Sequence, residues 1–405
     1  MSEPSAAENE YRYLLSPAAI RERARDVLGR VEAGRSPHWL LDEGRLPDVT
    51  ERVIRVTRAE YPDPTRIPYH SRFRHFDVGG VARNRALGER IAHESPAEQL
   101  AVRTELVITS VLLDAGAGAA WRFRELEGGT YARSEGLAVA SYHLFLNGGF
   151  SSDRGSVRAD AAGLAAFDGA ALRRAFQVTD DNPLAGGDGR AELLSRLGRV
   201  VAENPRYFGR EAPRLGNLGL HLFGQARDGR LRASVVLDTV LDALSPIWPG
   251  REQLAGKNLG DVWRHSELGL IPFHKLSQWL SYSLLEALEA SGVAIDGTDE
   301  LTGLAEYRNG GLFVDAGVLQ PRSPSVTSET HAVDSDLVIE WRALTILLLD
   351  RVADSVRGVF GLDRNQLPLA RVLEGGTWRA GRAIALELRA DGSPPLKLHT
   401  DGTVF

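Results

Sequence analysis

Apolar residues recur along most of the chain with the spacing of helices rather than of strands. Ser95-Pro96-Ala97-Glu98 combines a capping box with a proline at the first helical position, and the apolar run that follows ends near Gly116. A second run begins near Ser134 and ends at Asn147-Gly148-Gly149. Both segments are predicted to be helices with defined starts and ends.

Three further apolar stripes keep the helical period, and Pro205, Gly292 and Gly361 end them; they cover residues 191–204, 272–292 and 335–361. Strand patterns are few. Residues 231–238 fit either a short strand or a helix, residues 61–80 look like an irregular polar insertion, and the chain from Leu386 onward looks like an irregular tail. The pattern predicts a mainly α-helical protein with a few short strands.

Composition narrows the possible partners. The chain has 405 residues, of which 43% are hydrophobic and 25% charged, with a net charge of −6. This charge argues against binding to nucleic acid or to an anionic membrane. No apolar run reaches the ~20 residues of a membrane helix and no signal pattern opens the chain, so a cytoplasmic location is expected. The absence of cysteine excludes thiolate nucleophiles and thiolate metal sites.

Lysine is rare. Lysine and arginine total 48, and only Lys257, Lys275 and Lys397 are lysines. Because arginine supplies nearly every other cation, a retained lysine is a candidate for a role that needs a compact ammonium group. Lys275 would share one helix face with Gln278 and Tyr282. That face can be an ordinary solvated surface or part of a site.

The segment 67–80, "IPYHSRFRHFDVGG", concentrates polar side chains. His70 and His75 lack the i, i+4 spacing of a helical metal pair, and no nearby carboxylate pair completes a set, so a metal site is not favoured. In an extended segment Arg72 and Arg74 would share a face, where two guanidinium groups suit a phosphate or a carboxylate. Salt bridges that fix an irregular segment explain the same residues equally well.

Two later segments each contain a glutamate and an arginine, one next to a glycine-rich turn signal and the other inside an apolar helix. Glu306 and Arg308 stand directly before the turn signal Asn309-Gly310-Gly311, which is expected to end a helix. They form either a catalytic corner or a structural pair at a helix C-terminus. Glu340 and Arg342 lie inside the most apolar helix and should be paired if they are buried.

Phosphate-loop, GxSxG, HExxH and dinucleotide-binding motifs are absent, which weakens kinase, α/β-hydrolase, zincin and Rossmann interpretations. The residues alone therefore indicate a helical protein whose polar cleft contains arginines and carboxylates and suits an anionic small molecule.

Several segments together resemble a known family; they are 67–80, "RSEGLAVASYHLFLNGGFSSD" (133–153), "LAEYRNGGLFVDAGVL" (304–319), "VIEWRAL" (338–344) and the terminal "DGTVF" (401–405). They are similar to the uracil-catabolism protein-four (Urg3) family over nearly the whole chain. This resemblance implies a place in the pathway that degrades uracil through its nucleotide.

A more distant resemblance concerns the chemistry. "GGTYARSEG" (128–136), "FHKLSQ" (273–278) and "LTGLAEYR" (301–308) resemble "GKTYSG", "FYKRAQ" and "LTMFADYR" of the queuosine 5'-phosphate N-glycosylase (queuosine salvage) family. That family has a helical DNA-glycosylase-like fold. The resemblance implies that Lys275 and Glu306 stand where the glycosylases carry an active-site lysine and aspartate.

The same resemblance implies further substrate-binding positions. Tyr131 lies in the first matched segment, and "VIEWR" resembles "EVEIR", which places Glu340 and Arg342 on matching positions. "TSVLLDAGAGAAW" (109–121) resembles "TDTLNFSFW", which places Asp114 and Ala115 near the base pocket. The aromatic residues that would stack a large base are missing there, which suits a small leaving group.

Together the resemblances imply an N-glycoside hydrolase that needs no metal or other cofactor and releases urea from ribosylurea or its phosphate. Glu306 would stabilise the charge at C1', while Lys275 and Arg308 would orient substrate and carboxylate. The early loop would be a lid holding the phosphate through four donors, His70, Arg72, Arg74 and His75. Two alternatives stay open, an amidohydrolase that attacks the ureido group and a non-catalytic pathway protein.

The implied domain organisation follows from these matches. Residues 1–90 are expected to form a helical N-terminal segment with the polar loop, and residues 91–405 the glycosylase-like catalytic domain, with lobes at 91–210 and 211–405.

Overall fold

The computed structural model describes residues 5–114, 116–118, 120–126, 128–153, 155–248 and 252–399. The chain divides into two compact units, each built from segments that are distant in sequence. Of the described residues, unit 1 comprises those within 5–70, 252–278 and 297–399, and unit 2 comprises those within 71–248 and 279–296. The division at residue 90 that the sequence suggested stays a prediction.

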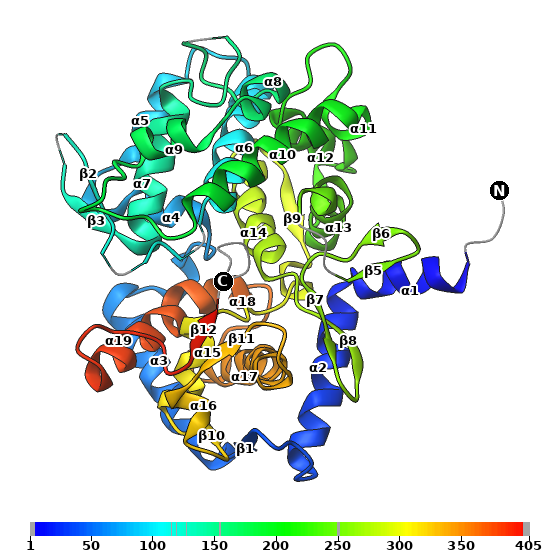
Figure 1. The fold of residues 1–405 in the computed structure, drawn as a ribbon, viewed down its shortest axis with the longest axis vertical. Coiled ribbons are helices and arrows are strands. Elements are labelled where there is room, and N and C mark those ends of the chain that lie inside the picture. The colour runs from blue at the N-terminus through cyan, green and yellow to red at the C-terminus, as the bar shows by residue number, and fades with distance from the viewer. Residues whose placement is uncertain are drawn as a thin grey trace. The chain divides into compact units, whose positions relative to one another are not determined.

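Unit 1 is built around α17 (Asp336–Phe360), which is buried along most of its length. Figure 1 shows α2 (Pro17–Glu32), α3 (Leu46–Glu60) and α15 (Tyr307–Asp315) around it. A helix that is apolar on nearly all sides needs such a surrounding. Its left-handed C-cap, Gly361, is the residue at which the sequence predicted the end. The other helical elements of unit 1 are α1 (Ala6–Leu14), α16 (Ser325–Ser328), α18 (Leu369–Val372), α19 (Trp378–Leu388), the short turns η1 (Glu43–Arg45), η2 (Pro64–Arg66) and η5 (Thr298–Glu300), and the π-helical turn η6 (Leu373–Thr377).

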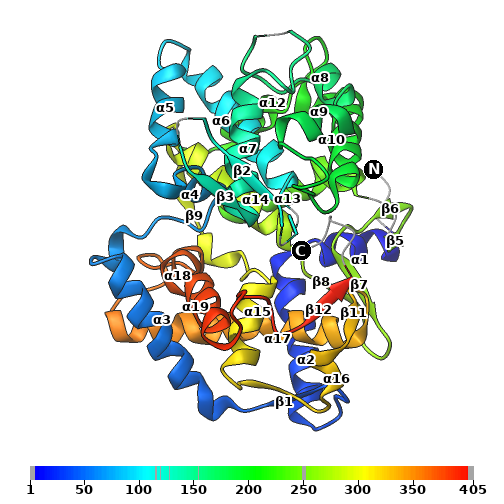
Figure 2. The same ribbon diagram turned by 60° about the vertical axis from the view of Figure 1, so that its left-hand side comes forward.

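Unit 2 packs α6 (Pro96–Leu112) beside α7 (Arg133–Leu146) and α12 (Gly216–Gln225), as Figure 2 shows. The Ser95 hydroxyl accepts the Glu98 N–H at 3.2 Å, so the predicted cap of α6 is confirmed. The other helical elements of unit 2 are α4 (Arg72–Phe76), α5 (Arg83–Arg90), α8 (Ala161–Ala165), α9 (Gly169–Ala175), α10 (Gly187–Glu203), α11 (Pro205–Phe208), α13 (Ala233–Leu244), η3 (Val78–Gly80) and η4 (Ser245–Ile247). The helix α14 (Lys275–Glu289) belongs to both units, since its residues up to Gln278 are assigned to unit 1 and those from Trp279 onward to unit 2.

Strands are short, and within the described residues they pair only in twos. The antiparallel pairs are β1 (Trp39–Leu41) with β10 (Leu319–Pro321), β2 (Arg122–Arg124) with β3 (Thr130–Ala132), β5 (Gln253–Leu254) with β6 (Lys257–Asn258), and β7 (Val262–His265) with β8 (Gly269–Pro272). The parallel pairs are β4 (Arg230–Arg232) with β9 (Ala294–Asp296) and β11 (Thr330–Ala332) with β12 (Lys397–His399). The prediction of a mainly helical fold with few short strands is confirmed, and its likeness to DNA glycosylases stays a prediction.

Two local predictions need correction, and one segment that was left open is settled. Pro272 does not open a helix but ends β8 opposite Val262, and α14 begins at Lys275. The segment 231–238, which fitted either a strand or a helix, contains both, since the strand β4 is followed directly by the helix α13. The tail from Leu386 is not wholly irregular, because β12 pairs in parallel with β11. The terminal "DGTVF" lies outside the described residues.

Candidate functional site

Glu306 is the N-terminal cap of α15. Its Oε2 accepts the Arg308 N–H at 2.8 Å and its Oε1 accepts the Asn309 N–H at 2.6 Å. The residue is only 7% exposed. The first turn of the helix therefore fixes both carboxylate oxygens. The sequence placed Glu306 at the end of a helix, and the structure shows it at the start of one.

The glycines that suggested a turn allow helices to pack closely instead. A Cβ added to Gly310 would lie 2.7 Å from the Trp341 ring, and one added to Gly311 would lie 3.1 Å from Pro395. The Trp341 indole N–H also donates to the Gly310 carbonyl at 3.0 Å. Packing of α15 on α17 outweighs the low helix propensity of glycine, about 1 kcal/mol per residue.

Lys275 is the first residue of α14 and is 8% exposed. Its backbone N–H donates to Asp261 Oδ2 at 2.9 Å. The preceding residue, His274, has a φ of +48° and donates its Nε2–H to the Leu14 carbonyl at 2.9 Å. Gln278 is fully buried, so the interpretation of this helix face as a solvated surface is wrong.

Arg342 is buried and bound to Asp261 through two parallel bonds. Its Nη1 and Nη2 donate to Oδ1 and Oδ2, each at 2.8 Å. The guanidinium carbon lies 4.0 Å from the centroid of the Phe273 ring. Burial raises the pKa of the Asp261 carboxyl, but the charge and hydrogen bonds of Arg342 outweigh burial and hold that pKa well below its usual range.

These contacts connect the two catalytic candidates within unit 1. Arg342 reaches Lys275 through Asp261, and its Nε donates to the carbonyl of Ala305, the residue before Glu306, at 3.4 Å. The Gln278 side-chain oxygen also accepts the Thr302 N–H at 3.3 Å. Arg342 was a candidate for substrate binding, and that role stays a prediction; the structure pairs its guanidinium with Asp261.

Glu340 belongs to a separate buried cluster on α17. Its Oε2 accepts the Ser36 hydroxyl at 2.5 Å, and its Oε1 lies 3.4 Å from Arg30 Nε and 3.4 Å from His265 Nε2. Glu340 is fully buried. The expectation that Glu340 and Arg342 would be paired if buried is therefore confirmed.

His70 is held by Glu374, a residue of η6. His70 Nδ1 lies 2.8 Å from Glu374 Oε2, while Glu374 Oε1 accepts the Tyr61 hydroxyl at 3.0 Å. Because the carboxylate can only accept, the hydrogen sits on His70 Nδ1. The His70 ring centroid lies 6.0 Å from that of Trp378.

Arg308 lies at the same tryptophan. It is 4% exposed, and its guanidinium carbon lies 5.3 Å from the Trp378 ring and 5.1 Å from the Tyr307 ring. Its Nε has no hydrogen-bond partner, and no carboxylate of the described residues pairs with it. In unit 1, His70 and Arg308 therefore both lie near Trp378. Glu306 caps the same helix, α15, that carries Tyr307 and Arg308.

In unit 2, α4 carries Arg72, which is fully buried. Arg72 Nη1 lies 2.9 Å from Asp114 Oδ1, and its Nε donates to the Ser110 hydroxyl at 2.7 Å. Burial lowers the pKa of Arg72, and the charge of Asp114 opposes that effect. The guanidinium carbon lies 5.4 Å from the Trp279 ring.

His75, also on α4, meets the same cluster. Arg72 Nη1 donates to His75 Nδ1 at 3.2 Å, and the Ser134 hydroxyl lies 3.0 Å from that atom and 2.8 Å from both Asp114 oxygens. Because arginine can only donate, His75 Nδ1 is an acceptor. The single Ser134 hydroxyl proton serves either Asp114 or His75. Ala115, predicted beside Asp114, lies outside the described residues.

Arg74 does not share the environment of Arg72. It pairs with Glu286, which also accepts the Ser71 hydroxyl, and its side chain is 28% exposed. The prediction of one extended face is wrong because α4 is helical, which turns the two side chains about 200° apart.

Tyr131 lies on β3 in another network of unit 2. Its hydroxyl accepts from Arg83 Nη2 at 3.1 Å and from the Gly129 N–H at 3.2 Å. Arg83 is in turn paired with Glu125. The contacts of Tyr131 within the described residues lie in this network and not in the Arg72 cluster.

Sequence reasoning missed four residues that shape these clusters, namely Ser134, Asp261, Glu374 and Trp378. The segment "EGGTW" (374–378) repeats the theme of a carboxylate beside paired glycines that drew attention to 306–311. Asp261 carries no such local signal, since its partner Arg342 is 81 positions away in sequence.

Two kinds of feature are absent from the described part of the chain. No group of three or more histidine, aspartate or glutamate side chains there could hold a metal ion. No helix there is long and apolar enough to cross a membrane.

Comparison with known proteins matches almost the whole chain. The family described as "Protein of unknown function (DUF1688)" matches residues 13–405. "Protein urg3" of Schizosaccharomyces pombe is 39% identical over 400 residues, which cover 97% of this chain and 98% of that protein. "Uracil catabolism protein 4" of Lachancea kluyveri is 36% identical over 440 residues, with 98% and 99% covered.

Proposed function

The chain belongs to the DUF1688 family, and from that premise we propose that it acts in uracil catabolism as an N-glycoside hydrolase. The proposed reaction releases urea from a ribosylurea or its phosphate. The names of the two relatives support the pathway, and the resemblance to queuosine salvage enzymes supports the reaction. The substrate is a small nucleotide-derived molecule.

The fixed carboxylate of Glu306 is the observation that carries the proposal. Both of its oxygens are oriented by the first turn of α15, and Lys275 is fixed to the same unit through Asp261 and Arg342. A carboxylate held in this way can face a developing positive charge without first having to reorganise.

Hydrolysis would break the bond between C1' and nitrogen. The bonding pair leaves with the urea nitrogen, which gains a proton, and water supplies the hydroxyl group that C1' gains. The transition state carries positive charge on C1' and the ring oxygen. We assign Glu306 to stabilise that charge, and Lys275 to orient the substrate and the carboxylate.

Exchange of Glu306 for glutamine tests the proposal. Glu306→Gln removes the negative charge but keeps a cap acceptor, so we expect a folded protein whose kcat for urea release falls at least about 100-fold. Glu306→Asp restores the charge at a shorter reach and should keep more activity than the glutamine variant. Urea and ribose would be measured after incubation with ribosylurea and its phosphate. Turnover of the glutamine variant at the wild-type rate would refute the assignment.

One observation in unit 2 favours a second candidate, an amidohydrolase. The Ser134 hydroxyl lies 3.0 Å from His75 Nδ1, an arrangement that could activate it toward the ureido carbonyl. Asp114 competes for the same proton, which makes this the weaker candidate. The products separate the two reactions, because an amidohydrolase leaves nitrogen bonded to C1' and releases no urea.

A further inference from the structure

We propose that Arg308 binds the anionic group of the substrate, a phosphate monoester on ribose, in a subsite that it forms with Trp378 and His70. The sugar part of this inference rests on the proposed function. The anion part rests on the burial and contacts of Arg308 itself.

Arg308 differs from the other buried arginines of unit 1. Among the described residues these are Arg30, Arg342 and Arg357, and each has a carboxylate partner. Arg308 is 4% exposed and has no carboxylate partner within the described part of the chain. A buried charge without a counter-charge is strongly unfavourable, so a protein retains one where a ligand supplies the opposite charge.

The surroundings of Arg308 leave the edge of its guanidinium for such a ligand. The aromatic rings of Tyr307 and Trp378 lie within cation–π distance of the planar group, and its Nε is buried without a partner. The face of an aromatic ring offers no oxygen or nitrogen acceptor for the N–H bonds of the guanidinium. Those donors match the paired oxygens of a phosphate.

The backbone holds Arg308 in place. Its N–H donates to the Glu306 carboxylate, and its carbonyl lies where a Cβ on Gly381 would be only 2.2 Å away. The close approach of α19 to α15, visible in Figure 2, therefore depends on this glycine. Because Glu306 and Arg308 share one helix turn, the distance between the carboxylate and the anion subsite is set by α15.

His70 supplies a second nitrogen group at the same tryptophan. Glu374 fixes the His70 ring through Nδ1, and the ring lies 6.0 Å from Trp378, centroid to centroid. His70 was a candidate phosphate donor from the sequence. The structure places it in the same unit as Arg308, where the two share Trp378.

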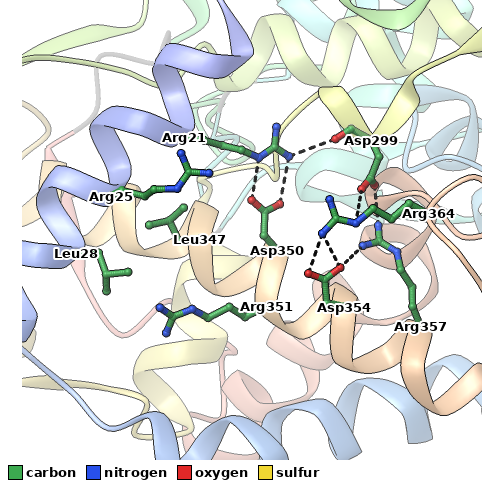
Figure 3. A pocket seen from close by; sticks show the side chains of 10 residues that line it. All are labelled: Arg21, Arg25, Leu28, Asp299, Leu347, Asp350, Arg351, Asp354, Arg357 and Arg364. Carbon is green, nitrogen blue, oxygen red and sulfur yellow. Dashed lines mark hydrogen bonds and ion pairs between the residues drawn. The ribbon is translucent and has the colours of Figure 1, made fainter.

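Elsewhere in unit 1, a pocket is lined by several arginines that already have carboxylate partners. A cavity of about 360 Å³ between α2 and α17 is lined by Arg21, Arg357 and Arg364, among others. Figure 3 shows that aspartates neutralise them: Arg21 bonds Asp350, and Arg357 and Arg364 bond Asp354. Arg21, Arg357 and Arg364 are thus paired with carboxylates, whereas no carboxylate of the residues that the structure describes pairs with Arg308.

The test is calorimetric titration of ribose 5-phosphate and of ribose into the full chain. For Arg308→Gln we expect the Kd for ribose 5-phosphate to rise about 30- to 100-fold, since charge-assisted hydrogen bonds are lost, and the Kd for ribose to stay unchanged. The Kd of Arg308→Lys for ribose 5-phosphate should lie between those of wild type and Arg308→Gln, because an ammonium group keeps the charge but cannot form paired planar bonds. Equal affinity of wild type and Arg308→Gln for ribose 5-phosphate would overturn the subsite.

Arg382 offers a matched control. It is exposed, and its guanidinium carbon also lies over the Trp378 ring, at 5.9 Å. Arg382→Gln should change the Kd for ribose 5-phosphate by no more than about twofold. If Arg382→Gln weakens the binding of ribose 5-phosphate as much as Arg308→Gln does, the weaker binding comes from altered packing at Trp378.

Thermal unfolding separates a ligand role from a structural one. Without ligand, Arg308→Gln should raise the melting temperature by about 1–3 °C, because an unpaired buried charge is removed. A fall of several degrees would contradict the proposal and indicate that Arg308 serves packing.

The subsite and the proposed reaction can fail independently. Arg308-dependent binding of ribose 5-phosphate without urea release would keep the subsite and refute the hydrolase. Equal release of urea from ribosylurea and its phosphate, unchanged by Arg308→Gln, would keep the hydrolase and refute the subsite.

Discussion

Arg72 in unit 2 and Arg308 in unit 1 are alike in type, burial and aromatic neighbour, yet they differ in electrostatics. Each lies over a tryptophan, Arg72 at 5.4 Å from Trp279 and Arg308 at 5.3 Å from Trp378. Arg72 has Asp114 as a counter-charge and hydroxyl and imidazole groups as acceptors. Arg308 has no carboxylate partner among the described residues.

The difference distinguishes a buried charge that stabilises the folded protein from one that we assign to ligand binding. The Arg72 cluster is neutralised within the unit, so its positive charge contributes to folding. The charge of Arg308 is not neutralised there, so it contributes only when an anion binds. Burial of an arginine therefore does not identify a site, and the missing partner does.

The largest effect that sharpens this comparison is expected at Arg72. Arg72→Gln leaves Asp114 without its counter-charge and should lower the free energy of unfolding by about 3–5 kcal/mol in denaturant titrations. Asp114→Asn and the double variant complete a mutant cycle, in which the second exchange should cost much less after the first. If Arg308→Gln lowers the free energy of unfolding as much as Arg72→Gln does, the proposed difference between the two arginines is wrong.

A smaller, pH-dependent effect is expected at Asp261, which pairs Arg342 in the same unit as Arg308. The folded pKa of Asp261 lies below that of an unfolded aspartate, about 4, so its contribution to stability is complete above that pH and is lost as the pH falls below it. We expect this contribution to be about 2–3 kcal/mol. Unfolding measured from pH 6 down to pH 2 should show a weaker acid dependence in Asp261→Asn. An unchanged pH profile would mean that Arg342 does not stabilise the ionised carboxylate.

The smallest effect is expected at Arg74. Its ion pair with Glu286 is partly exposed, so Arg74→Gln should change the free energy of unfolding by less than about 1 kcal/mol. The two arginines of α4 thus provide an internal scale for the effect of burial. A loss at Arg74 equal to that at Arg72 would show that burial is not what separates them.

Local signals explain which helices the sequence predicted well. Ser95 starts α6 and Gly361 ends α17 through contacts made within a few residues. The orientation of Glu306 was missed because Asn309-Gly310-Gly311 has the composition of a turn, while packing of Gly310 on Trp341 and the cap by Glu306 favour a helix there. Contacts between distant segments override local preference, and one sequence does not reveal them.

The candidate site was predictable only in part for the same reason. Resemblance to known enzymes pointed to Glu306 and Lys275. It could not show that Asp261 and Arg342 connect them, or that Trp378 joins His70 and Arg308. The pairing of Arg74 with Glu286 also depends on a residue more than two hundred positions away.

The interleaving of the two units has a consequence for synthesis of the protein on the ribosome. Helix α2 packs on α17, and β1 pairs with β10, so the N-terminal part of unit 1 needs partners that emerge about three hundred residues later. At ordinary rates of translation that interval is on the order of tens of seconds. The apolar faces of α2 and α3 then have no native cover, whereas most of unit 2 is encoded without interruption. The nascent chain is therefore most prone to aggregation or chaperone binding at its first seventy residues.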